Sequence, residues 1–332
     1  MKKIIAIALL LCMVLVMGGW TADGGEYKLG MGVVVSTASS KTNNAQVDAT
    51  VAAVVLDKDG KIVACRIDCA QSKMDVTDGE VDTAKEFLSK VELKEDYGMV
   101  ARANAPYEWY EQAAHFEEYA IGKTGEEILA EETVLNDSGH TVFVDETLRA
   151  SVSISVSDIQ QAVAKACADE QGFTFTANGE CKLGLSCNTT AAESVAATAE
   201  EEGVVKMYTN FAAAVVDSEG KVLAALEDAI QPQIKMDEDG EIGDITFKGT
   251  KRELKEDYNM VKFSDATLEW YEQAANFAQY AAGKTAEELK GAELQVNEEG
   301  HNVFVDEALR ASVSISVDGM IDVLVKAIGY AA

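Results

Sequence analysis

The chain has 332 residues, of which 48% are hydrophobic, and it carries a formal net charge of −29. This length favours two domains, and the hydrophobic fraction is large enough to give each a buried core, so the acidity does not indicate disorder. Nucleic acid is not expected as a partner, because binding its phosphates requires a basic footprint that this composition lacks.

The N-terminus has the features of a secretory signal peptide. Lys2 and Lys3 precede an apolar run over residues 4–17, which is too short for a membrane span. We therefore assign residues 1–22 to a signal peptide and expect a secreted or cell-envelope protein. Cys12 lies inside the apolar run, a poor context for lipoprotein cleavage, so a lipid anchor is not favoured.

The remainder of the chain contains a long-period duplication. Three blocks recur at an offset of 161 residues: 93–97 with 254–258, 108–112 with 269–273, and 142–156 with 303–317. The repeating unit is domain-sized. The sequence therefore predicts repeat domain 1 over residues 26–168, a short polar linker over 169–179, and repeat domain 2 over 180–331.

Each copy is expected to begin with a β-hairpin and to continue as helices. Apolar runs at 51–56 and 61–69 flank an acidic turn ending in Gly60, and runs at 211–216 and 221–226 flank a turn ending in Gly220.

In the middle of each copy, apolar side chains recur at helical spacing: Trp109, Ala113, Phe116 and Ala120, matched by Trp270, Ala274, Phe277 and Ala281. A second helix closes each copy, with Ser157 and Asp318 as its expected N-caps. The expected class is α+β: two tandem homologous domains, each an antiparallel sheet with a β-hairpin packed against helices and closing on a C-terminal helix.

The cysteines do not form a disulfide framework, because five of them lie outside the signal segment. Cys65 and Cys69 fall on one side of an expected strand, about 13 Å apart, which is too far for a bond. We interpret them as buried thiols. Cys181 and Cys187 are close enough in sequence that a local disulfide stays open.

Four other features favour structural interpretations. The Gly-Lys-Thr stretches at 122–124 and 283–285 lack the upstream glycine of a phosphate loop, so each glycine ends a helix and each threonine caps the next. The acidic stretch 237–244 does not complete a calcium loop and is expected to be a solvated turn. His140 and His301 are expected in turns. Asp68 and Asp228 are expected at solvated strand ends, with the lining of a site as the alternative. No metal site is predicted.

The most informative segment is 145–153 (DETLRASVS), which recurs as 306–314 (DEALRASVS) before the closing helix. It resembles the FMN-binding domain of secreted bacterial flavoproteins and of sodium-pumping NADH:quinone reductase subunits, whose signature is Asp-x-x-Ser/Thr-Gly-Ala-Thr-x-Ser/Thr. Ser153 and Ser314 stand at the hydroxyl position that family members can esterify to FMN phosphate. Arg149 and Arg310 replace the family glycine, and Leu148 and Leu309 replace the hydroxyl residue before it.

The resemblance implies one cofactor-binding site in each copy, for FMN or another anionic small molecule. The first comprises Arg149, Ser151 and Ser153, and the second comprises Arg310, Ser312 and Ser314. The serines would contact phosphate, and the arginines would neutralise it, an ionic contact replacing the covalent link. Repeated aromatic residues could supply a bed for the flavin: Trp109, Tyr110, Trp270 and Tyr271. A competing interpretation of 150–156 is a half-buried strand, because polar and apolar residues alternate there.

Two functions follow from these patterns. The first is an exported binding protein of FMN-binding-domain ancestry, holding flavin or another anionic small molecule and serving extracellular electron transfer with a redox partner protein. The alternative is a non-catalytic cell-surface or envelope protein that has lost the cofactor. No nucleophile, base and orienting group recur together, so no catalytic residues are predicted and an enzyme is the less favoured class.

Overall fold

The computed structural model describes residues 19–331, and its class is α+β, as the sequence predicts. The expected signal segment lies outside the described residues for 1–18, whereas 19–22 already belong to the first strand. The strands are β1 (Gly19–Ser36), β2 (Asn44–Leu56), β3 (Ile62–Asp75), β4 (Thr133–Leu135), β5 (Thr141–Phe143), β6 (Phe173–Thr190), β7 (Gly203–Lys206), β8 (Tyr208–Asp217), β9 (Val222–Ile230), β10 (Gln233–Met236), β11 (Ile242–Thr246), β12 (Leu294–Val296) and β13 (Asn302–Phe304).

The helices come in two similar series. The first half contributes α1 (Lys90–Leu93), α2 (Met99–Ala103), α3 (Trp109–Ala120), α4 (Gly125–Leu129), α5 (Glu146–Ser151) and α6 (Ser157–Ala168). The second contributes α7 (Lys251–Leu254), α8 (Met260–Phe263), α9 (Trp270–Ala281), α10 (Ala286–Lys290), α11 (Glu307–Ser312) and α12 (Asp318–Ala331). Short 3-10 helices at Lys94–Tyr97 and Lys255–Tyr258 follow α1 and α7. In the part of the chain described here, no helix is both long and apolar enough to cross a membrane.

Both predicted hairpins are confirmed, and an aspartate organises each turn. Asp57 Oδ1 accepts hydrogen bonds from the amides of Asp59 and Lys61, both at 2.9 Å, between β2 and β3. Asp217 does the same between β8 and β9. Gly60 and Gly220 have φ of 73° and 76°, which glycine adopts without a steric penalty.

The strands of the two halves form one sheet. Among the described residues its order is β3-β2-β1-β6-β8-β9, with every neighbouring pair antiparallel. The first part of β1 pairs with the first part of β6, from Gly19 opposite Lys182 to Leu29 opposite Phe173. Beyond this region β1 pairs with β2, and β6 pairs with β8. The two long strands therefore join the halves.

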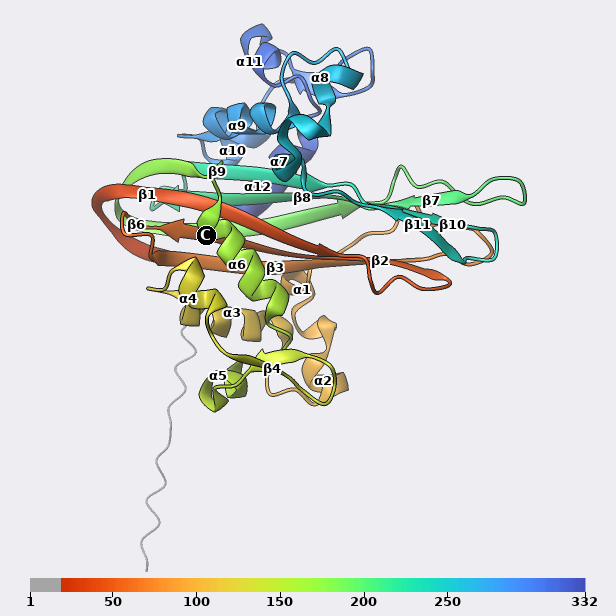
Figure 1. The fold of residues 1–332 in the computed structure, drawn as a ribbon. Helices are drawn as coiled ribbons and strands as arrows, with labels where there is room; N and C mark the ends of the chain where they lie inside the picture. Colours follow the sequence, from red (N-terminus) through yellow and green to blue (C-terminus); the bar gives the residue numbers. More distant parts are fainter. Residues whose placement is uncertain (1–18, 332) are drawn as a thin grey trace, which may run out of the picture.

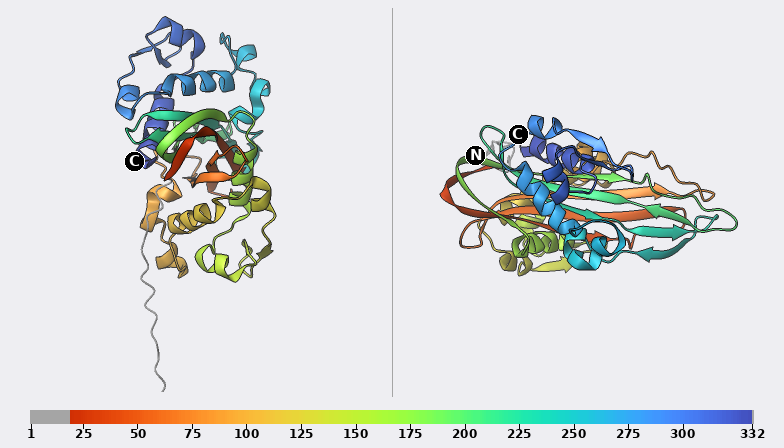
Figure 2. Two further views of the ribbon diagram at one scale, coloured as in Figure 1. Left: turned by 90° about the vertical axis from the view of Figure 1, so that its left-hand side faces the viewer. Right: turned by 90° about the horizontal axis from the view of Figure 1, so that it is seen from above.

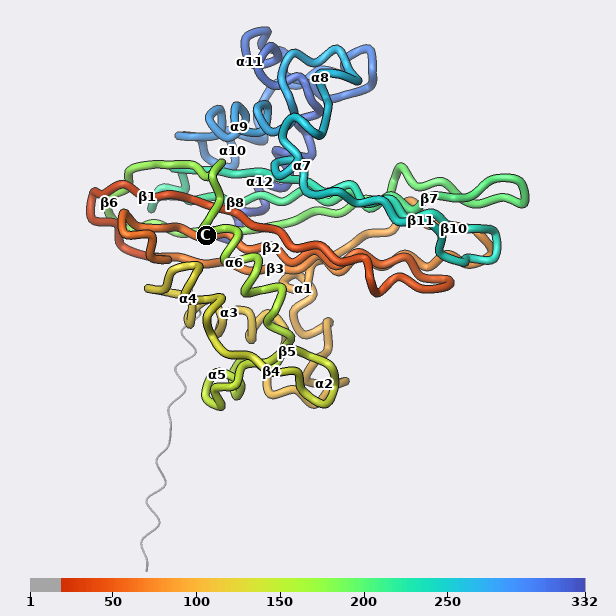
Figure 3. Tube along the Cα trace, viewed as in Figure 1, coloured from red at the N-terminus to blue at the C-terminus, as the bar shows by residue number. Residues whose placement is uncertain are grey.

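The molecule is layered, with strands in the middle and helices outside (Figures 1 and 2). One buried cluster combines strand residues of both halves, including Leu29 and Val51 from the first and Leu183 and Phe211 from the second. Two further clusters lie under the helices, one in each half. Figure 3 shows the chain of the first half looping on one side of the strands and that of the second half on the other.

The apolar side chains predicted at helical spacing belong to the buried core in both copies. Trp109, Phe116, Trp270 and Phe277 are buried, and they pack α3 and α9 against the strands. The closing helices α6 and α12 lie across the centre of the sheet, where a Cβ atom on Gly30 or Gly184 would collide with the carbonyl oxygen of Ala166 or Ala327. Residues 28–30 (Lys-Leu-Gly) recur as residues 182–184, and their glycine has a packing role, since only glycine permits this approach.

The expected linker is largely strand. Residues from Phe173 onward belong to β6, and Tyr27 in β1 lies opposite Phe175. Phe175 and Ala177 are buried between exposed neighbours, the alternation of a half-buried strand. The expected N-caps also differ: Val156 is the N-cap of α6, and Ser157 and Asp318 are the first residues of their helices. Val156 is fixed there because its amide donates to the Thr141 carbonyl oxygen.

The five described cysteines are free. Cys65 and Cys69 are buried on the helix-facing side of β3, as expected, and burial raises the pKa of both thiols. Cys181 and Cys187 both lie along β6, so extended backbone separates them and the open question of a local disulfide is answered.

Two equivalent ion pairs cross between the halves. Lys165 of α6 pairs with Glu253 of α7 at 2.7 Å, and Lys326 of α12 pairs with Glu92 of α1 at 2.6 Å. Each lysine also donates to a strand carbonyl oxygen, that of Val33 or Cys187. The Lys326 pair is the more buried, with side chains 24% and 13% exposed against 47% and 43% for the Lys165 pair.

We expect Lys326→Met to lower the free energy of unfolding by about 2–3 kcal/mol, because it leaves the largely buried Glu92 carboxylate without its cation. Lys165→Met is the matched control and should cost under about 1 kcal/mol, because water solvates that pair. Urea unfolding of the two variants measures both values, and equal losses would contradict the assigned difference in burial.

Candidate functional site

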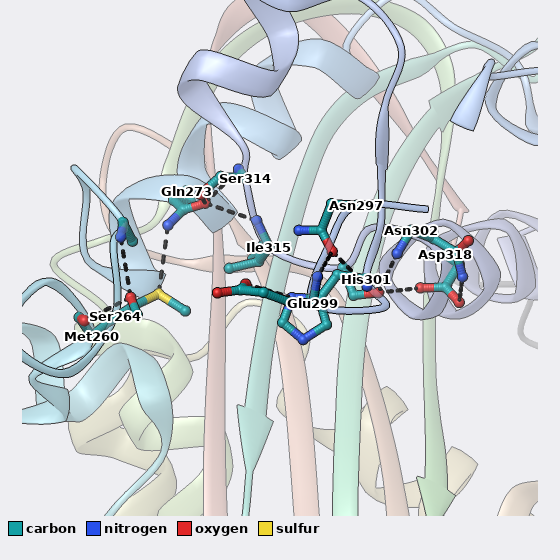
Figure 4. A network of polar contacts seen from close by, with 12 residues as sticks. Met260, Ser264, Gln273, Asn297, Glu299, His301, Asn302, Ser314, Ile315 and Asp318 are labelled. Atoms are coloured by element: carbon teal, nitrogen blue, oxygen red, sulfur yellow. Dashed lines mark hydrogen bonds and ion pairs between the residues drawn. The ribbon is translucent and has the colours of Figure 1, made fainter. Parts of the chain in front are cut away.

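The serines expected to bind phosphate donate their hydroxyl protons to a glutamine in each half. Ser153 Oγ lies 3.0 Å from Gln112 Oε1 in the first half. In the second half, shown in Figure 4, Ser314 Oγ lies 3.2 Å from Gln273 Oε1. The same glutamine oxygen accepts the amides of Ser153 and Ile154, at 2.7 and 3.1 Å, with equal distances in the second half. Each Ser-Val-Ser segment is therefore fastened to α3 or α9 by three hydrogen bonds to one buried oxygen.

The other residues of the expected cofactor site lie in short helices with local partners. Ser151 and Ser312 end α5 and α11 and donate to the carbonyl oxygens of Leu148 and Leu309. Arg310 donates to the carbonyl oxygens of Phe304 and Val305. Arg149 lies 3.8 Å from Glu146, on the surface. The strand interpretation of residues 150–156 is wrong, since α5 runs to Ser151.

The surroundings of this segment in the first half are acidic. A hollow of about 460 Å³ beside Asp145 is lined by Glu127, Glu131 and Glu132 as well. Such a surface repels phosphate and attracts cations. The repeated tryptophans do not form a flavin bed there, because Trp109 and Trp270 are 5% and 3% exposed and belong to the cores under the helices. Tyr110 and Tyr271 donate their hydroxyls to Glu95 and Glu256.

We expect Gln273→Leu to destabilise the protein by about 2–4 kcal/mol. The substitution removes the oxygen that accepts hydrogen bonds from the amides of Ser314 and Ile315 and leaves these amides without an acceptor in the folded protein. Denaturant unfolding measures this loss. Gln295→Leu, on the exposed strand β12, is the control and should change the unfolding free energy by less than about 0.5 kcal/mol. A loss at Gln273 no larger than the control would show that its oxygen does not hold the segment.

Two aspartates expected at solvated strand ends are buried, so that expectation is wrong. Asp68 and Asp228 are 3% and 5% exposed. Asp68 Oδ1 accepts the amides of Cys69 and Val91, and Asp228 Oδ1 accepts those of Ala229 and Arg252. Burial raises the pKa of Asp228 to about 6, with Arg252 opposing the rise. Both carboxylates fix the first turn of a helix, α1 or α7, to a strand.

A lysine lies against aromatic rings in both halves. Lys251 Nζ is 4.7 Å from the Tyr208 ring, 4.8 Å from Tyr258 and 5.2 Å from Trp270, and it donates to the Tyr208 hydroxyl. Burial lowers the pKa of Lys251 to about 7, with Asp228 and Glu193 opposing. Lys90 occupies the equivalent position over Tyr97 and Trp109. The protein's own amine fills this cage of rings, which indicates a structural cation–π contact.

The predicted helix caps and turns are confirmed. Thr124 and Thr285 cap α4 and α10 in capping boxes with Glu127 and Glu288. Asp237 Oδ1 accepts amides of Asp239 and Glu241 in the turn before β11. His140 and His301 follow turns and are exposed. Over residues 19–331 no group of three or more His, Cys, Asp or Glu side chains is arranged to hold a metal ion.

The two halves differ sharply where α3 and α9 face their edge strands. In the first half, Glu117 accepts the Ile67 amide at 2.8 Å and pairs with Arg66 at 3.2 Å. Burial raises the pKa of Glu117 to about 7, and Arg66 opposes this. In the second half the residues at these three positions are Ala278, Glu227 and Leu226, so the carboxylate has moved from the helix to the strand and the arginine is gone.

This exchange opens a pocket of about 340 Å³ between β9 and α9. Glu227 lines it, is 3% exposed, and its Oε1 has no hydrogen-bond partner. Burial raises the pKa of Glu227 well above that of a free glutamate, and no neighbouring charge offsets the effect. A pocket with a buried carboxyl group is the arrangement in the described chain that most resembles a ligand site.

Sequence reasoning missed both the glutamines and this pocket, although signals for each were present. Gln112 and Gln273 stand in the identical repeated block 108–112 and 269–273, among apolar residues of a buried helix face. Glu227 was visible only as a difference between the copies, a carboxylate where the first copy has Ile67.

Glu227→Gln should stabilise the protein at pH 8 by on the order of 1 kcal/mol and leave it unchanged near pH 4. The folded pKa lies above the unfolded one, so the folded state binds the proton more tightly. The stability contributed by protonation of Glu227 is fully present below the pKa of the unfolded state and is lost as the pH rises through the pKa of the folded state. Glutamine does not titrate, so the variant does not lose this stability at high pH. Melting temperatures of the parent and the variant across this pH range test the expectation, and curves separated by a constant amount would refute it.

No protein-family model, curated protein or solved structure matches the chain. The interpretation of its sites therefore depends on the chemistry of its own residues.

Proposed function

We propose that this chain is a non-catalytic, extracytoplasmic binding protein, built from two homologous units, that carries no flavin and offers an acidic surface to cationic partners. Its extracytoplasmic location is supported by the charged start and the apolar run of residues 4–17, and its two units by the duplication at an offset of 161 residues.

The observation that carries the proposal is the shared glutamine contact. In both halves the hydroxyl that would meet phosphate, on Ser153 or Ser314, donates to Gln112 or Gln273 instead. To bind there, an anion would have to break that hydrogen bond and the two hydrogen bonds that the neighbouring backbone amides donate to the same glutamine oxygen. These segments therefore serve the fold, which favours the cofactor-free alternative over the flavin expectation.

Charge supports the second part of the proposal. Four carboxylates line the hollow beside Asp145, and the whole chain has a formal net charge of −29. His115 Nδ1 lies 3.6 Å from Glu118 and its ring packs edge-on against Tyr107, and His301 Nδ1 lies 3.6 Å from Glu299. In the sequence no nucleophile, base and orienting group recur together in the two copies, which supports a non-catalytic role.

The test is the absorbance spectrum of the mature protein, secreted from a flavin-replete host that also expresses a flavin transferase. We expect a colourless protein, an intact mass without an FMN adduct, and no uptake of added FMN. A flavoprotein carrying the full family signature, expressed in parallel, shows that the transferase is active. A flavin band that remains with acid-precipitated protein, or one released to the supernatant, would overturn the proposal in favour of a covalent or an ionic FMN site.

A further inference from the structure

The pocket between β9 and α9 is a specific feature of the second half. At the equivalent place in the first half, Arg66 and Glu117 form an ion pair at 3.2 Å. Replacement by Leu226 and Ala278 removes both charges and much of the side-chain volume there. The duplicated halves have thus diverged at these positions.

The buried part of the pocket is apolar except for two groups. Leu226, Ala274 and Ala278 are at most 5% exposed, and Glu227 lies among them. The half-buried lining residues are polar: Gln171, Tyr271, Glu272 and Asn276. The volume of about 340 Å³ is at the lower end of the range typical of small-molecule sites.

The second buried polar group, Arg252, does not serve Glu227. Its Nη2 donates to both carboxylate oxygens of Asp169, at 3.2 and 3.0 Å, and to the Gln171 carbonyl oxygen at 2.8 Å. That ion pair is itself buried, with side chains 7% and 8% exposed. Glu227 Oε1 is therefore left as an acceptor that the described chain does not use.

We propose that this pocket binds a small primary amine, as its ammonium form on a short alkyl or aryl group, with the ammonium paired to Glu227. An ammonium donates the hydrogen bonds that the carboxylate lacks, and the three apolar side chains contact the hydrocarbon part. An anion would meet the Glu272 carboxylate with like charge, and a neutral molecule would form no ion pair with Glu227. The strong negative charge of the chain also concentrates cations near the surface.

The test is calorimetric titration of the full mature chain with benzylamine and with butylamine, against benzyl alcohol and benzoate as neutral and anionic probes of similar size. We expect saturable one-to-one binding of at least one amine, with Kd of about 1 mM or tighter. Glu227→Gln should weaken this binding at least about tenfold. Glu126→Gln, which removes one exposed carboxylate on α4, is the matched control and should bind like the parent.

A second variant tests the pocket rather than the charge. Leu226→Arg combined with Ala278→Glu rebuilds the first-half ion pair in the second half and should abolish binding, with circular dichroism showing that it folds. The proposal is overturned if neither amine saturates, if Glu227→Gln binds as tightly as the parent, or if benzyl alcohol or benzoate binds as well as benzylamine. The flavin spectrum bears on a different part of the molecule, so the two proposals fail independently.

Discussion

The pairing of β1 with β6 is the constraint on which the rest of the structure depends. Hydrogen bonds from Gly19 to Leu29 on one strand and from Phe173 to Lys182 on the other join two three-stranded groups into one sheet. The face that each group turns away from its own helices is apolar, and the two faces share one buried cluster. Because an exposed apolar sheet face would be costly, each half needs the other to complete its core.

Duplication around this pairing lets the two halves be compared position by position. Contacts that both halves keep hold the scaffold: the glutamine that fastens each Ser-Val-Ser segment, and the lysines of α6 and α12 that reach across to Glu253 and Glu92. A repeated motif is thus as much a sign of shared packing as of shared chemistry. Glu227, whose buried Oε1 lacks a hydrogen-bond partner, stands at a position where the halves differ.

Signals local in the sequence predicted the hairpins and the main helices. The features that the sequence did not predict depend on contacts between residues far apart in the chain. The hairpin turns at Gly60 and Gly220 and the aromatic stripes of α3 and α9 depend on residues within a few positions of each other. Residues 173–179 resembled a linker because of their polar neighbours, yet they are strand because β1, far away in sequence, supplies their partners. The fate of Ser153 likewise depended on Gln112, 41 residues earlier.

The Arg66–Glu117 pair gives an internal reference for the cost of Glu227. Glu117 of α3 and Glu227 of β9 are both buried where a helix faces an edge strand. Glu117 receives an amide and a guanidinium, whereas Oε1 of Glu227 receives neither. A buried carboxyl group without a partner destabilises the folded state unless it is protonated or a ligand supplies the missing charge. The apolar alternative at this position is Ile67 in the first half. In the second half a destabilising buried carboxyl group stands at this position and lines a pocket. This is the arrangement expected of a site in which a ligand supplies the missing hydrogen bonds and charge.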